Sequence, residues 1–162
     1  MLETSVASVN SALQRAHAGM KQHLPERRLE WAPEVDPTVA ERELVQRYVA
    51  LNESADARGF AEILHEDVRF SMPPDPRVWD GRDSVIQSWI VGGFGTDIFG
   101  SIRCSVTHAN RQPAVAAWVR KPGDTAYTPL AIDVLRIQDG LVADIVTFGA
   151  PVFESFGLPR TV

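Results

Sequence analysis

Two polar side chains lie in apolar surroundings where their chemistry would matter. Asp133 is in the middle of the apolar segment Leu130–Leu135, where burial would raise the pKa of the carboxyl. A protonated carboxyl there can donate a hydrogen bond into a pocket; the alternative is a structural Asp paired with Arg120 or Arg136. Tyr48 lies on the apolar stripe of a predicted helix, where its hydroxyl either points into a pocket or is satisfied within the core.

A group of large side chains accompanies these two residues. They can either line an apolar cavity or fill an ordinary core, and the sequence leaves both interpretations open. The residues predicted to line a pocket are Tyr48, Phe60, Met72, Trp79, Trp89, Trp118, Asp133 and Phe148. Phe94 and Phe99 belong to the same group of aromatic candidates.

Residue spacing argues against three other kinds of site: a metal site, a cysteine nucleophile and a phosphate-binding loop. His65-Glu66-Asp67 contains metal-ligating residue types. However, adjacent side chains at the end of a predicted helix point in different directions, and no second His has the spacing of a metal ligand. No metal and no cofactor are therefore predicted. Cys104 alternates with Ile102 and Val106, which indicates a buried small residue rather than a nucleophile. The segment Gly92-Gly93-Phe94-Gly95 does not complete a phosphate-binding glycine motif.

The elements that position these residues follow from hydrophobic periodicity. Helical spacing predicts a helix in 1–22, prolines predict an extended linker over 23–37, and a main domain over 38–150 precedes a tail over 151–162. The main domain reads helix, helix, strand, helix and then four strands of period two. Helices that precede a hairpin-linked sheet pack on one of its faces, so the predicted class is α+β.

Composition excludes several classes of protein. With 44% hydrophobic and 23% charged residues, the chain is of ordinary globular type, and its single cysteine excludes an internal disulfide. A net charge of −5 does not suit a nucleic-acid binder as a whole. No apolar run approaches the roughly 20 residues of a membrane span and no signal peptide opens the chain. These features predict a cytoplasmic protein without membrane contact.

The segment Ser5–Ala16 reads S-V-A-S-V-N-S-A-L-Q-R-A. It resembles the recognition helix that closes region four of extracytoplasmic-function sigma factors, which reads the −35 promoter element. In the context of a full-length factor, the resemblance implies DNA contacts from Ser8, Asn10, Ser11, Gln14 and Arg15. From the residues alone, an ordinary polar helix face is the competing interpretation.

The rest of the chain resembles the SnoaL-like domain that one group of these sigma factors carries after region four. The matching pieces are Phe70–Pro74, Trp79–Arg82, Ala109–Ala114 and Phe153–Pro159. This domain belongs to the ketosteroid isomerase and nuclear transport factor superfamily. The resemblance implies a cone-shaped fold, with three helices packed in a curved antiparallel sheet around a pocket. Sigma region two is absent, so the chain is interpreted as the C-terminal part of a longer factor.

The superfamily also suggests roles for single residues. Ketosteroid isomerases use a tyrosine of the first helix and an aspartic acid of a late strand as an oxyanion hole, and the resemblance places Tyr48 and Asp133 there. The general base of those enzymes falls at Met72, whose thioether cannot abstract a proton. Catalysis would need another base, and the candidates are Asp75, Asp80 and His108.

The resemblance predicts a C-terminal regulatory domain that tunes transcription initiation. Its implied partners are sigma regions two and four and the RNA polymerase core. The predicted contact surfaces are the linker around Trp31 and the tail Pro151–Pro159, because Phe153, Phe156 and Leu158 need something to pack against. One alternative is a SnoaL-like enzyme acting on a small hydrophobic substrate, and another is a pocket that holds a small hydrophobic ligand without converting it. An apolar outer sheet face would favour a homodimer.

Overall fold

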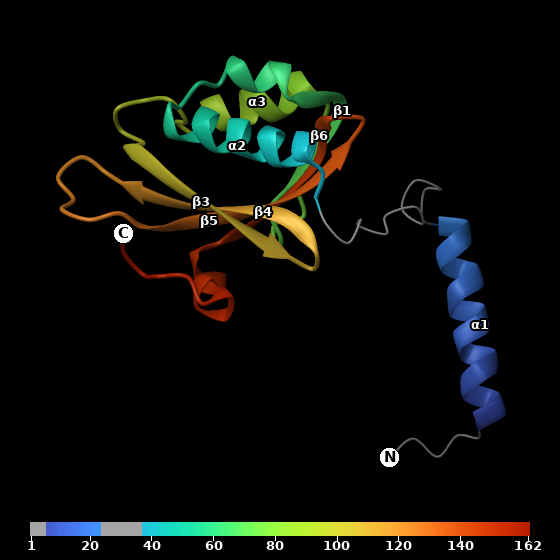
Figure 1. The fold of residues 1–162 in the computed structure, drawn as a ribbon. Coiled ribbons are helices and arrows are strands. Elements are labelled where there is room, and N and C mark those ends of the chain that lie inside the picture. Colours follow the sequence, from blue (N-terminus) through green and yellow to red (C-terminus); the bar gives the residue numbers. More distant parts are fainter. Residues whose placement is uncertain (1–5, 24–36) are drawn as a thin grey trace. The chain divides into compact units, whose positions relative to one another are not determined.

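The computed structural model describes residues 6–23 and 37–162 (Figure 1). The chain divides into two compact units, Met1–Glu34 and Val35–Val162, and each is described by itself. The first unit contains one helix, α1 (Val6–His23), on which Val9 and Leu13 are about half exposed, at 50% and 54%. Residues 24–36 of the predicted linker, Trp31 included, lie outside the described part of the chain.

The first helix of the main domain, α2 (Val39–Glu53), begins at a capping box that the sequence predicts. The Thr38 hydroxyl accepts the backbone N–H of Glu41 at 3.1 Å, and the Glu41 carboxylate accepts the backbone N–H of Thr38 at 2.7 Å. This cap fixes where the helix starts and therefore which residues lie on its apolar face. The buried residues of that face are Leu44, Val45 and Tyr48.

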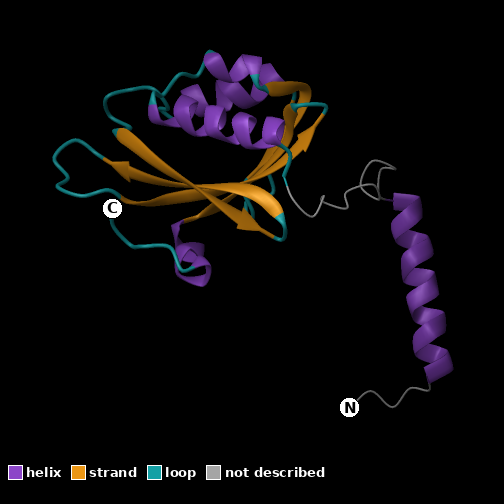
Figure 2. Ribbon diagram, in the orientation of Figure 1, coloured by secondary structure: helices purple, strands orange, loops and turns teal. Residues whose placement is uncertain are grey.

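Six strands form one curved sheet, which confirms the predicted α+β class. The strands are β1 (Leu64–Ser71), β2 (Val78–Asp80), β3 (Ser101–Ala109), β4 (Gln112–Arg120), β5 (Thr128–Gln138) and β6 (Leu141–Gly149). Their order across the sheet is β2-β1-β6-β5-β4-β3. Helices α2 and α3 (Arg82–Val91) lie against one face of this sheet (Figures 1 and 2).

Three local features differ from the sequence prediction. Strands β1 and β6 pair in parallel, so the sheet is mixed; pairing between strands so distant in sequence leaves no hairpin signal. The predicted second helix is a single 3-10 turn, η2 (Gly59–Glu62), after which Leu64 already begins β1. His65-Glu66-Asp67 therefore lies in a strand and not at a helix end. The short strand β2 was not predicted.

The sheet has an apolar cluster on each face. One lies under the helices and includes Tyr48, Phe60, Leu135 and Ile145. The other lies on the opposite face and includes Trp118, Ile132 and Phe153. Alternate residues of β5 enter different clusters, which explains why this strand is apolar on both faces.

The second cluster is covered by the chain's own tail. The 3-10 turn η3 (Ala150–Phe156) places Phe153, only 2% exposed, edge-on against Trp118, with ring centres 5.2 Å apart. Trp118 Nε1 donates a 2.9 Å hydrogen bond to the Pro159 carbonyl. Phe153 and Leu158, which are expected to need something to pack against, find it within the domain itself, because both pack on this cluster. Part of the outer sheet face proposed for dimerisation is occupied as well.

Candidate functional site

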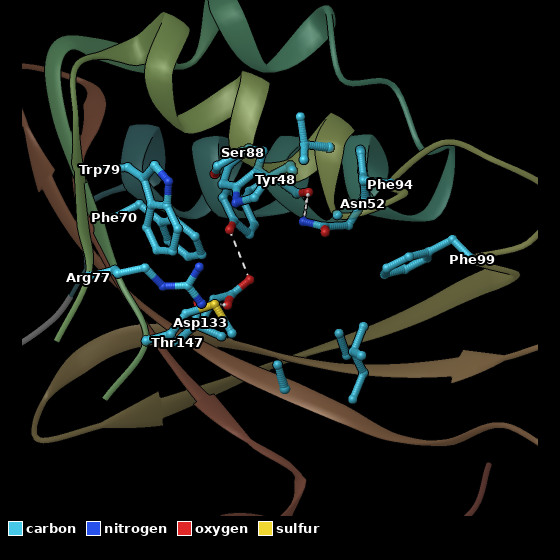
Figure 3. Close-up of a pocket in the computed structure, with 17 residues that line it drawn as sticks. Tyr48, Asn52, Phe70, Arg77, Trp79, Ser88, Phe94, Phe99, Asp133 and Thr147 are labelled. Atoms are coloured by element: carbon cyan, nitrogen blue, oxygen red, sulfur yellow. Dashed lines mark hydrogen bonds between the residues drawn. The ribbon is translucent and has the colours of Figure 1, made fainter. Parts of the chain in front are cut away.

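A cavity of about 520 Å³ lies between the helices and the inner face of the sheet (Figure 3). Its walls are mainly aromatic, and the rings come from β1, β2, α3 and the loop that follows α3. These rings are Phe70, Trp79, Trp89, Phe94 and Phe99. A volume of this size is within the range of small-molecule sites.

Three polar side chains meet at one place on the cavity wall. Tyr48 of α2 donates a 2.9 Å hydrogen bond from its hydroxyl to Oδ2 of Asp133 on β5 (Figure 3). Thr147 of β6 is the cross-strand partner of Asp133, and its hydroxyl donates to Oδ1 at 2.5 Å. Both carboxyl oxygens of Asp133 thus accept a hydrogen bond from a neutral hydroxyl.

This arrangement differs from the alternative in which Asp133 pairs with an arginine. The guanidinium of Arg120 lies over the ring of Tyr127, 4.9 Å from its centre. Arg136 donates hydrogen bonds to the Gln138 side chain and to the Ala143 carbonyl. The electrostatics of Asp133 are set instead by burial and by its two hydroxyl partners.

Burial controls the ionisation of these groups. It raises the pKa of the Asp133 carboxyl, and the hydrogen bonds from Thr147 and Tyr48 oppose the rise in part. Burial also raises the pKa of the Tyr48 hydroxyl, with the nearby Asp133 charge acting in the same direction. The pKa of Cys104 rises to about 12, first through burial and then through the charges of Asp133 and Glu53. At neutral pH the phenol and the thiol therefore keep their protons.

Three further polar side chains line the cavity and were missed by sequence reasoning. Asn52 lies one helical turn after Tyr48 and donates to its backbone carbonyl at 3.1 Å. Ser88 donates to the Val85 carbonyl at 2.7 Å. Arg77 lies in the segment before β2, where no sequence signal marked it. The four-residue spacing from Tyr48 could have found Asn52.

Five of the eight residues predicted to line a pocket line this cavity: Tyr48, Met72, Trp79, Trp89 and Asp133. The other three, Phe60, Trp118 and Phe148, do not line it.

The three exceptions have simple structural reasons. Phe60 is 1% exposed and lies behind the wall, edge-on to Trp89 with ring centres 4.9 Å apart. Trp118 and Phe148 belong to the cluster on the opposite face of the sheet. Asp133 pairs with Thr147 across the sheet, so the neighbouring Phe148 must point the other way.

The candidate bases do not reach the cavity. Met72 lines it, whereas Asp75, Asp80 and His108 are absent from its lining. Hydrogen bonds from Arg77 hold the pKa of Asp75 below its usual range. Among the described lining residues Asp133 is the only carboxylic acid, and none is a histidine. The site can hold and orient a molecule, but a second group for acid–base chemistry is not in place.

The residues predicted to contact DNA lie on α1, in the other compact unit. Ser8, Asn10, Ser11, Gln14 and Arg15 are all exposed there. Within residues 6–23 and 37–162, no three His, Cys, Asp or Glu side chains are grouped as metal ligands would be. Over the same ranges, no helix has the length and apolar character needed to cross a membrane.

Comparison with known proteins identifies a family and sequence relatives for this chain. The profile of the SnoaL-like domain matches residues 45–145, and the chain belongs to this family. Over 160 residues the chain is also 29% identical to the ECF RNA polymerase sigma factor SigG of Mycobacterium tuberculosis, in strains CDC 1551 / Oshkosh and H37Rv. The match covers 98% of this chain and 42% of SigG, in its C-terminal part.

Solved structures share the fold. An NTF-2 like protein of unknown function from Burkholderia xenovorans LB400 has a TM-score of 0.53 at 13% identity, covering 67% of this chain and 81% of that one. A candidate ketosteroid isomerase from Kribbella flavida has a TM-score of 0.51 at 23% identity, covering 67% and 76%. A de novo designed protein with a curved β-sheet has a TM-score of 0.55 at 15% identity, covering 74% and 93%. At these identities the likeness concerns the fold.

Proposed function

We propose that this chain is the C-terminal regulatory part of a sigma factor. In this proposal the SnoaL-like domain tunes transcription initiation through contacts with sigma regions two and four or with the RNA polymerase core. The similarity to SigG along 98% of the chain supports this assignment. The exposed polar residues of α1, Ser8 to Arg15, suit contacts with promoter DNA when the remaining sigma regions are present.

We further propose that the cavity binds a small, largely apolar molecule without converting it. The observation that carries this proposal is the pairing of Tyr48 with Asp133 in a cavity that Met72 also lines. The resemblance to ketosteroid isomerases places their general base at Met72. A thioether cannot take a proton from a bound substrate. The bound molecule would therefore act as an effector, favouring one of two arrangements of the factor.

A transcription assay tests the regulatory proposal. Run-off transcription is measured with the full reading frame that contains this chain, and with a version that ends before Thr38. We expect the deletion to change the transcript yield at equal factor concentration. As a matched variant, Ala131→Trp fills the cavity while the domain remains present, since Ala131 lines it. Equal yields from the intact and the shortened factor would remove the regulatory proposal.

The alternative function is an enzyme, and one observation favours it. The Tyr48 hydroxyl and the Asp133 carboxyl meet at the cavity wall. To act as two oxyanion-hole donors, the hydroxyl would have to turn its proton from Asp133 to the substrate, and the carboxyl would have to be protonated. The missing base would then have to come from the substrate or from water. Turnover of a small hydrophobic substrate by the purified chain, lost in Asp133→Asn, would establish this alternative in place of the effector proposal.

A further inference from the structure

The Asp133 carboxyl faces the cavity without a cationic partner. Its two oxygens accept hydrogen bonds from the neutral hydroxyls of Tyr48 and Thr147, and no Lys or Arg of the described residues forms an ion pair with it. A carboxylate removed from water is ordinarily compensated by a cation or else protonated. A cation bound beside Asp133 would provide the compensation for the ionised carboxylate that no Lys or Arg of the described residues provides.

The aromatic walls of the cavity that Asp133 lines also suit a positive charge. The Phe70 ring lies 5.1 Å from that of Trp79 and 5.7 Å from that of Trp89, measured between centres. Aromatic faces attract organic cations within about 6 Å of the ring centre. The guanidinium carbon of Arg77 already uses one of these faces, 5.4 Å from the centre of the Trp79 ring.

The Arg77 guanidinium does not compensate the Asp133 carboxylate. It donates to both carboxylate oxygens of Asp75, with its Nη2 2.6 Å from Oδ2 and its Nε 3.0 Å from Oδ1. Its side chain is 71% exposed, so this ion pair lies at the solvent side of the cavity. The charge of Arg77 is compensated there, and Asp133 remains the acidic group of the cavity that has no counter-charge.

We propose that the cavity prefers an organic cation, a quaternary or protonated amine on an apolar body, with its charge beside the Asp133 carboxylate and its body against the aromatic walls. This inference rests on the proposed function, namely that the cavity binds a small molecule at all. It specifies the chemical class of that molecule. An adjacent cation also favours the ionised carboxylate, because an opposite charge lowers the pKa of Asp133.

Two probes of equal shape test this preference. Benzyltrimethylammonium carries the charge, and neopentylbenzene has a carbon atom in place of the nitrogen. Binding of each to the full chain is measured by isothermal titration calorimetry in the same low-salt buffer. We expect the cation to bind at least tenfold more tightly than its neutral counterpart, since desolvated contacts with a carboxylate and with rings both favour it.

Two variants locate the effect. Asp133→Asn keeps the shape of the side chain and removes the charge, so it should lower the ratio of the two affinities to the part that the aromatic rings supply. Asp80→Asn makes the same change of net charge at an exposed position outside the cavity lining, and it should leave the ratio unchanged. Because the two-probe comparison on the unmodified chain needs no variant, a poorly folded Asp133→Asn protein does not weaken the test.

The outcomes separate this inference from the proposed function. Equal affinity for the two probes in the unmodified chain would overturn the cation preference while keeping ligand binding. Binding of neither probe would overturn both the cation preference and the ligand-binding proposal. A ratio that falls equally in Asp133→Asn and Asp80→Asn would show that general charge attraction causes it, and would also overturn the assignment to Asp133.

Discussion

The Tyr48 hydroxyl donates a 2.9 Å hydrogen bond to the Asp133 carboxyl, across 85 positions of sequence. This bond joins α2 to the middle of the sheet, at the wall of the aromatic cavity. It ties the orientation of the helix to the one carboxylic acid among the described lining residues. A change at either residue should therefore affect both stability and the ionisation of the site.

Tyr48→Phe removes the hydroxyl and leaves one Asp133 oxygen without its donor. We expect the free energy of unfolding to fall by about 1–3 kcal/mol, the usual cost of an unsatisfied buried polar group. Urea denaturation measures the change. Tyr127→Phe serves as the control, since its hydroxyl bonds to Ser101, away from Asp133. NMR titration should show a higher pKa for Asp133 in Tyr48→Phe alone, and an unchanged pKa would contradict the assigned bond.

The raised pKa of Asp133 predicts a pH dependence with a definite sign. The folded protein holds this proton more tightly than the unfolded chain, whose carboxyl titrates near the ordinary 3.8. The stabilisation from this proton is therefore complete below about pH 4 and is lost as pH rises through the folded pKa. Urea denaturation at several pH values measures this effect. As pH rises from about 4 through the folded pKa of Asp133, the free energy of unfolding of the unmodified chain should fall relative to that of Asp133→Asn.

Asp75→Asn provides the comparison of opposite sign. Hydrogen bonds from Arg77 lower the pKa of Asp75 in the folded protein, so its contribution is present above about pH 4 and is lost as pH falls further. The difference between this variant and the unmodified chain should shrink on acidification. Parallel stability curves for Asp133→Asn and the unmodified chain would contradict the burial assigned to Asp133.

Cys104 should react slowly while the protein is folded. Its pKa rises from 9.0 to about 12, which lowers the thiolate fraction at pH 8 about a thousandfold. Labelling with a chromogenic disulfide should be complete within the mixing time in denaturant and should follow unfolding in native buffer. Rapid labelling of the native chain at the rate of an exposed cysteine would show that the thiol is accessible.

The tail should stabilise the domain chiefly through the burial of Phe153. Phe153→Ala removes a ring that is 2% exposed and packed on Trp118, so a loss of about 3–5 kcal/mol is expected. Phe156→Ala changes a ring of the same tail that is 38% exposed, and it should cost about 0.5 kcal/mol or less. Chemical denaturation of the two variants gives both values, and equal effects would mean that the tail is not anchored by Phe153.

Local sequence patterns identify two polar residues of the cavity wall, but not the residues around them. An Asp within an aliphatic strand and a Tyr on an apolar helix stripe were both recognisable, and the structure brings them together. Thr147 and Arg77 were missed, because cross-strand register and loop position set their place. Trp118 was assigned to the wrong face, since β5 and its neighbours are apolar on both sides and alternation then cannot say which face is inside.

The fold shows the same contrast between features that adjacent residues determine and features that depend on contacts between residues distant in sequence. The capping box at Thr38 and the hairpin between β5 and β6 are local features, since a few adjacent residues, Thr38 to Glu41 and the turn Asp139-Gly140, indicate each of them. The parallel pairing of β1 with β6 depends on contacts across most of the domain. The packing of η3 on the outer sheet face is also a tertiary contact. The apolar residues of the tail do not by themselves show which surface they pack on.

The central claim is that the cavity holds a molecule without acting on it as an isomerase would. The most direct test incubates the purified full chain with a steroid β,γ-enone and follows the ultraviolet absorbance of the conjugated product. We predict a rate equal to that of buffer, because Met72 cannot remove the proton that isomerisation requires. A rate above buffer that disappears in Asp133→Asn would contradict the claim.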